Sequence, residues 1–202
     1  MTLLDPKARA FAFDIHCLIV TADGWEQVPW NLQMVMPLHH KSISEPHKVT
    51  HMHPGGMVSY AILRSPSISA CSGTSAPVLL MLHGAGLEAD NELVTHQLDP
   101  LPDLCAFVLF PTGVTPWSGD DWHTWGFADV EASIEAIPNW ISATQWRGAL
   151  VDINRWLVSG HSNGGQGTWY ALAHRPDKVF AAAAVSGYLS IQSKLNSSRV
   201  IS

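Results

Sequence analysis

A short glycine-rich run carries the clearest chemical pattern in this sequence. It reads Gly-His-Ser-Asn-Gly-Gly from Gly160 onward, with an apolar segment before it and a helix-like segment after it. A serine flanked in this way sits on a sharp turn between a strand and a helix, the arrangement called a nucleophile elbow. The helix start also offers N–H groups and a positive dipole end to a developing negative charge. We therefore predict that Ser162 is a nucleophile, that Gly160, His161 and Gly164 support the turn, and that the N–H of Asn163 is an oxyanion-hole donor.

A second turn of small residues supports this interpretation. An apolar run over 77–82 ends in the sequence His83-Gly84-Ala85-Gly86. Small residues there let backbone N–H groups approach a tetrahedral intermediate closely. We predict that the N–H of Ala85, with that of Gly86 as the alternative, is the other half of the oxyanion hole. His83 is expected to order the loop rather than to act as a base.

The elements around these turns predict an α/β fold. Continuous apolar runs are typical of strands that are buried on both faces of a parallel sheet, and they cover 77–82, 105–110 and 179–185. A further strand is predicted over 155–159. Apolar residues at helical spacing predict helices over 127–146 and 168–174. Strands that alternate with helices in this way favour right-handed βαβ crossovers and a mostly parallel sheet.

The N-terminal part of the sequence reads differently. We predict a β-rich segment over 1–64, a Ser/Pro-rich connector over 65–76, a partial α/β domain over 77–190 and a polar tail over 191–202. A histidine-rich stretch over 38–55 is expected to be a solvated polar loop. A metal site built on His51 and His53 is the alternative, but no carboxylate or second regular histidine pair stands at ligand spacing, so no metal is predicted.

Composition narrows the class of protein. Hydrophobic residues make up 47% of the 202 residues, charged residues make up 14%, and the net charge is -6. These values argue against a disordered chain and against a nucleic-acid partner. No apolar run approaches the roughly 18 residues that cross a membrane, and no signal peptide is visible. Three scattered cysteines (Cys17, Cys71 and Cys105) predict no disulfide framework, so we expect a cytoplasmic location by default.

Residues 77–190 resemble the N-terminal two-thirds of an α/β-hydrolase domain. Within that superfamily they are most similar to the prolyl oligopeptidase-like (S9-type) serine hydrolases and esterases. The similar stretches are 78–86, 121–132, 155–167 and 174–187. The resemblance implies a three-layer α/β sheet and a Ser-His-Asp mechanism without a cofactor. In that mechanism Ser162 attacks a small ester or peptide substrate and forms an acyl-enzyme.

The resemblance also implies a catalytic acid and a catalytic histidine, and neither is found at its expected place in this sequence. In this fold the acid and then the histidine follow the serine along the chain, but only His174 and Asp177 do so here. Both are expected at the end of the sheet opposite Ser162. We therefore expect a truncated form that lacks the last strands, with a complementary chain as a possible partner. His123 remains an alternative base.

Two other functions stay open, as do the roles of one tryptophan-rich loop. The chain could be an inactive fragment or pseudoenzyme that only binds a partner chain, or an acyltransferase on the same fold. Trp117 and Trp122 are candidates for an apolar substrate wall or for packing, and Trp125 is expected to pack. The neighbouring Asp120 and Asp121 are expected to cap or be solvated rather than to catalyse.

Overall fold

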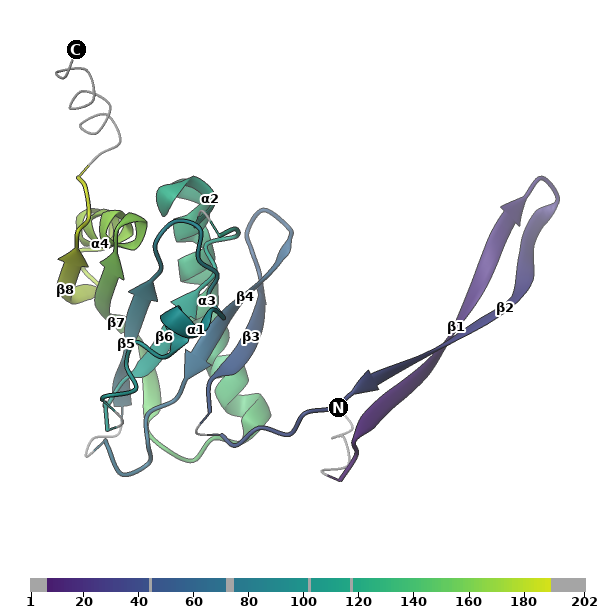
Figure 1. Ribbon diagram of the computed structural model, residues 1–202, viewed down its shortest axis with the longest axis horizontal. Helices are drawn as coiled ribbons and strands as arrows, with labels where there is room; N and C mark the ends of the chain where they lie inside the picture. The colour runs from purple at the N-terminus through teal and green to yellow at the C-terminus, as the bar shows by residue number, and fades with distance from the viewer. Residues whose placement is uncertain (1–6, 44, 72–74, 102, 117, 190–202) are drawn as a thin grey trace, which may run out of the picture. The chain divides into compact units, whose positions relative to one another are not determined.

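The computed structural model describes residues 7–43, 45–71, 75–101, 103–116 and 118–189 (Figure 1). The chain divides into two compact units, Met1–Ser42 and Ile43–Ser202. The first unit is an antiparallel hairpin of β1 (Ala10–Thr21) and β2 (Gly24–Pro37), in which Thr21 pairs with Gly24 beside the turn. The β-rich character predicted for the start of the chain is therefore confirmed.

The second unit is built on a six-stranded sheet with the order β3-β4-β6-β5-β7-β8. The strands β5, β6, β7 and β8 are parallel to one another, whereas β4 pairs antiparallel with both β3 and β6. This mixed, mostly parallel sheet confirms the predicted fold class. The bounds are β3 His47–Met52, β4 Val58–Arg64, β5 Ser75–Leu82, β6 Phe107–Pro111, β7 Leu150–His161 and β8 Val179–Val185.

Two apolar clusters cover the two faces of this sheet. Side chains alternate between the faces of a strand, so Val78 and Leu80 of β5 join the larger cluster while Leu79 packs against the smaller one. The helices α3 and α4 contribute to the larger cluster, and Val94 of α1 contributes to the smaller one. The helices are α1 Glu92–Thr95, α2 Ser118–Asp121, α3 Thr124–Thr144 and α4 Asn163–His174.

The structure differs from the predicted division at the N-terminal side. The strands β3 and β4 belong to the same sheet as the later strands, and not to the segment expected over 1–64. Part of the predicted polar loop over 38–55 is in fact β3. In this strand only Val49 and His51 are buried, and a histidine at an inward position hides the apolar alternation that marks a strand.

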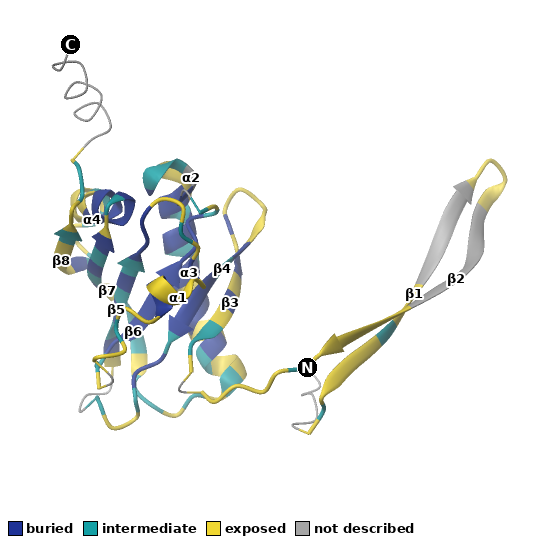
Figure 2. Cartoon of the chain, viewed as in Figure 1, coloured by how far each residue is buried: buried dark blue, intermediate teal, exposed yellow. Residues whose placement is uncertain are grey.

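The strand β8 is exposed although its sequence is apolar. It stands last in the strand order and pairs with β7 alone among the described strands. Only Val179 is buried, while Phe180 and Val185 are about half exposed. Figure 2 shows this contrast between β8 and the buried central strands.

Candidate active site

Ser162 occupies the junction between β7 and α4 in a backbone conformation that serine rarely adopts. It is the N-cap residue of α4, with φ 56° and ψ −115°. Its N–H donates to the carbonyl of Val185 at 2.9 Å, and its own carbonyl accepts from the N–H of Gln166 at 3.0 Å. A non-glycine residue with positive φ stores strain that the surrounding structure must hold. The half-buried serine is thus held on a sharp turn above the carboxyl end of the sheet.

The glycines around the serine are required by close backbone contacts. A Cβ atom at Gly160 would collide with the backbone of Gly164. A Cβ atom at Gly164 would collide with the carbonyl of Leu82 and lie 2.9 Å from the carbonyl oxygen of His83. The elbow therefore packs directly against the end of β5, where the second glycine-rich turn begins.

That second turn lies beside the serine. A Cβ atom at Gly84 would be 3.7 Å from the Cβ of Ser162. The N–H of Gly86 donates to the carbonyl of Pro116 at 2.8 Å. Within the described part of the chain we find no hydrogen-bond partner for the N–H of Ala85. Of the two alternatives predicted from sequence, Ala85 therefore has the backbone N–H that is not already bonded to a described residue, whereas the N–H of Gly86 is.

His83 and Trp122 brace this turn from within. The His83 ring is buried, and its Nδ1 and Nε2 lie 3.0 Å from the carbonyl oxygens of Gly84 and Thr112. The indole N–H of Trp122 donates to the carbonyl of His83 at 3.2 Å, and the two rings pack edge to face. Trp122 is fully buried, so it packs under the turn and presents no wall to a substrate.

The other tryptophans of that loop separate in position. Trp117 lies outside the described residues. Trp125 is about half exposed, and its ring stacks on His53 at 5.3 Å between centroids. The Nε2 of His53 lies 3.1 Å from the carbonyl of Trp125. His53 therefore helps to fix the start of α3, and it is buried, contrary to the expectation of a solvated loop.

A polar network that the sequence did not reveal holds the first residue of α4. Asn163 donates its side-chain N–H to Asp121 at 2.7 Å and accepts from the hydroxyl of Tyr188 at 2.7 Å. Burial raises the pKa of Tyr188, and the Asp121 carboxylate raises this pKa further. The phenol therefore stays protonated as a donor. The three side chains come from three separate segments, so no local spacing marks them.

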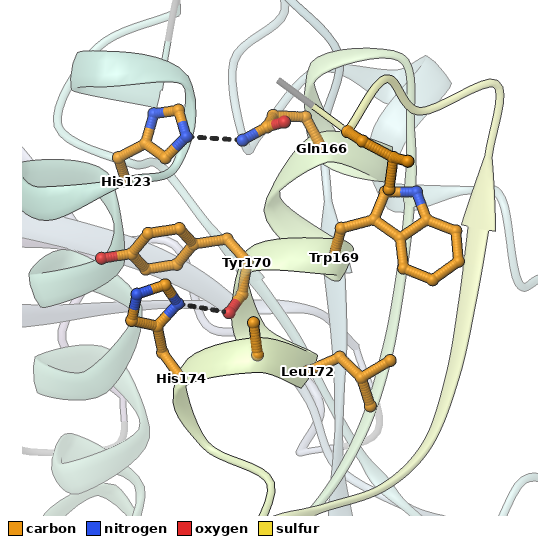
Figure 3. Close-up of a pocket in the computed structure, with 8 residues that line it drawn as sticks. His123, Gln166, Trp169, Tyr170, Leu172 and His174 are labelled. Atoms are coloured by element: carbon orange, nitrogen blue, oxygen red, sulfur yellow. Dashed lines mark hydrogen bonds between the residues drawn. The ribbon is translucent and has the colours of Figure 1, made fainter. Parts of the chain in front are cut away.

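His123 is not free to act as a base in this arrangement. Its Nδ1 lies 2.8 Å from the carbonyl of Asp120, so Nδ1 carries the proton. Its Nε2 then accepts from the side-chain amide of Gln166. Figure 3 shows His123 facing Gln166, with Tyr170 and His174 further along α4. These residues line a pocket of about 380 Å³.

The two downstream candidates for base and acid lie away from the serine, as the sequence predicts. The 12-residue helix α4 starts beside Ser162 and ends at His174, and a helix of this length spans about 18 Å. His174 stacks on Tyr170, and Asp177 follows just before β8 begins. Because β8 runs parallel to β7, its first residue lies at the end of the sheet opposite Ser162.

Asp120 caps α3, in line with the sequence prediction. Its carboxylate accepts from the backbone N–H groups of His123, Thr124, Trp125 and Gly126, at 2.7 to 3.1 Å. Burial alone would raise the pKa of Asp120. The N–H donors of Trp125, Gly126 and Thr124 outweigh burial, so the pKa lies below its ordinary value of 3.8.

We expect Asp120→Ala to lower the free energy of unfolding by about 1–2 kcal/mol at pH 7, since it removes a helix cap. The folded-state pKa is below the unfolded one, so this stabilisation is complete above about pH 4 and is lost as the pH falls through the folded-state pKa. Urea unfolding of both proteins at pH 7 and pH 3 measures the difference. An unchanged difference at pH 3 would show that the cap acts without its charge.

Known proteins with similar folds include several esterases and hydrolases. A fluorophosphonate-binding serine hydrolase of Staphylococcus aureus, solved with substrate bound, matches 75% of this chain and 60% of its own (16% identity, TM-score 0.55). The S-formylglutathione hydrolase of S. aureus matches 75% and 62% (16%, 0.52), and a bacterial brefeldin A esterase matches 75% and 44% (18%, 0.51). The chain has an α/β-hydrolase-like fold. No family model matches it.

A curated relative corrects the predicted location. An uncharacterized secreted protein of the fungus Arthroderma benhamiae is 49% identical over 162 residues. That match covers 79% of this chain but only 17% of the relative. The α/β-hydrolase-like unit also contains a Cys71–Cys105 disulfide, which the scattered cysteines did not predict. A secreted relative and a disulfide contradict the cytoplasmic assignment. In the described residues no helix is both long and apolar enough to span a membrane.

Proposed function

We propose that this chain contributes the nucleophile and oxyanion hole of a serine hydrolase that cleaves esters or peptide bonds. The observation that carries the proposal is Ser162 itself. It is held at φ 56° between a buried strand and a helix, beside the Gly84 turn. The S. aureus proteins with a similar fold are named as hydrolases, which agrees with this chemistry.

The proposed reaction is acyl transfer through a covalent intermediate. The Ser162 hydroxyl adds to the substrate carbonyl while a general base takes its proton. The N–H groups of Asn163 and Ala85 stabilise the oxyanion of the tetrahedral intermediate. The leaving group departs with a proton, and water then hydrolyses the acyl-enzyme. No cofactor takes part in this scheme.

We further propose that the base and its acid partner reach Ser162 from polypeptide that adds to the outer edge of β8, where no described strand pairs. The apolar strand is exposed, with Phe180 and Val185 about half open to solvent. Beside it, Trp169, Leu172 and Leu189 form an exposed apolar flank of the α4 pocket. A strand added in parallel would end close to Ser162, because β7 and β8 end there. The partner is thus a protein segment.

The test is covalent labelling of the purified 202-residue chain with a fluorophosphonate probe. We expect labelling that disappears in Ser162→Ala and persists in Ser159→Ala. Ser159 lies on β7, three residues before Ser162, and its hydroxyl donates to the carbonyl of Ala183. Equal labelling of the Ser162→Ala variant and the unmodified chain would refute Ser162 as the nucleophile.

The pH dependence of labelling tests where the base comes from. If no histidine takes the proton of the Ser162 hydroxyl, the labelling rate should rise continuously with hydroxide concentration. A rate that levels off near pH 6.5–7, the range of a histidine base, would show that a histidine of this chain already serves. Loss of that plateau in His123→Asn would then identify His123.

A further inference from the structure

Asp129 is a buried carboxylate that the proposed reaction does not use. It lies on α3 and is 0% exposed. Its Oδ1 is 2.8 Å from Nε2 of His51, and its Oδ2 accepts from the N–H of Gly113 at 2.9 Å. Burying a carboxylate is costly unless its oxygens are bonded. The free-energy cost of burying Asp129 is therefore lowest when His51 and the N–H of Gly113 both stay in hydrogen-bonding position.

The Gly113 N–H belongs to a peptide unit that also contacts the oxyanion turn. In this unit, the carbonyl of Thr112 lies 3.0 Å from Nε2 of His83, while the N–H faces Asp129. A negative charge at the N–H end polarises the peptide and strengthens its carbonyl as an acceptor. The unit thus joins Asp129 to the His83 ring through two hydrogen bonds.

His83 passes this restraint to the residues beside Ser162. The ring is buried, and a neutral imidazole carries one N–H, so Nε2 donates to Thr112 while Nδ1 only contacts the carbonyl of Gly84 at 3.0 Å, in the residue before the Ala85 donor. The segment that carries Thr112 also holds the end of the turn, where the carbonyl of Pro116 accepts from the N–H of Gly86. Asp129 is therefore connected to both ends of the turn.

We infer that Asp129 is a positioning residue for the oxyanion hole, acting through the Thr112–Gly113 peptide and His83 on the N–H of Ala85. The inference rests on the proposed function of Ser162. His51 holds the other oxygen of this carboxylate: its Nε2 donates to Asp129, while its buried Nδ1 has no partner in the described structure. The pair links β3 and α3 to the turn.

The test combines hydrogen exchange of individual amides with the rate of fluorophosphonate labelling at Ser162. In Asp129→Asn the side chain keeps its size and can accept from Gly113, but it loses the charge. We expect amide exchange at Gly86 and Gly113 to accelerate at least tenfold, with β7 unchanged, and labelling to slow about tenfold. Glu131→Gln is the matched control, because this carboxylate lies on the same helix and binds Arg175 at 2.6 Å; both readouts should stay unchanged.

A second pair of variants keeps the test decisive if Asp129→Asn fails to fold. His51→Leu removes the donor to Asp129 and should reproduce both effects. His51→Gln can still donate to the carboxylate and should restore most of the labelling rate and of the exchange protection. Equal effects of the two His51 variants would overturn the inference.

The outcomes separate this inference from the proposed function. Unchanged exchange at Gly86 and Gly113 in Asp129→Asn overturns the inference, whatever the labelling rate. Faster exchange with unchanged labelling also overturns it, since Asp129 would then be only structural. Labelling that survives Ser162→Ala refutes the proposed function instead. The hydrogen-exchange rates would then still test whether Asp129 restrains the turn.

Discussion

Gly164→Ala is expected to lower the free energy of unfolding by more than about 4 kcal/mol, a loss that single substitutions seldom cause. The added Cβ would collide with the carbonyl of Leu82. That carbonyl is backbone at the end of a buried strand, so no side-chain rotation relieves the clash. The helix α4 must then move away from β5, and Ser162 with it.

Urea unfolding and fluorophosphonate labelling measure the two consequences of Gly164→Ala. We expect a large drop in the unfolding midpoint together with loss of labelling. Gly84→Ala is the control for stability, because a Cβ there would make its closest contact at 3.4 Å, an ordinary van der Waals distance. A Gly164→Ala protein as stable as the Gly84→Ala protein would contradict the close packing of the elbow on β5.

Loss of the Cys71–Cys105 disulfide is expected to lower the free energy of unfolding by about 3–4 kcal/mol. The bridge joins the segment before β5 to the segment before β6, at a sequence separation of 34. A cross-link of this span removes much of the conformational freedom of the unfolded chain. Both cysteines also pack against the larger apolar cluster of the sheet.

Denaturation of the unmodified chain with and without dithiothreitol measures this effect. The double variant Cys71→Ser, Cys105→Ser should match the reduced protein and show no response to dithiothreitol. Cys17→Ser is the control, because Cys17 lies in the hairpin unit and should leave the response intact. A response to dithiothreitol that persists in the double variant would rule out this pairing.

Local sequence determined the parallel strands, the helix α3 and the two glycine turns. The apolar run over 77–82 lies within β5 because a strand inside a parallel sheet needs such a run. The run over 179–185 matches the bounds of β8, although most of that strand is exposed. The elbow was also predictable, because a Cβ atom at Gly160 would collide with the backbone of Gly164, four residues further along the chain. A Cβ atom at Gly164 would also collide with backbone, in this case the carbonyl of Leu82 on a neighbouring strand.

Some element boundaries were missed because their signal is weak in the sequence. The strand β3 carries His51 at an inward position, which reads as polar until Asp129 is known to face it. The helix α4 begins at Asn163, five residues before the predicted start, because its first turn is rich in glycine and shows no helical periodicity.

Only the tertiary structure decided which distant residues meet. The Cys71–Cys105 bridge, the Tyr188–Asn163–Asp121 network and the Asp129–His51 pair each join segments far apart in the sequence. Trp122 was equally consistent with a substrate wall and with packing until its position under the His83 turn was known. Local sequence determines backbone conformation, because turns and strands depend on near neighbours. The partners of a side chain depend on how the sheet brings its segments together, and that is fixed only when the core packs.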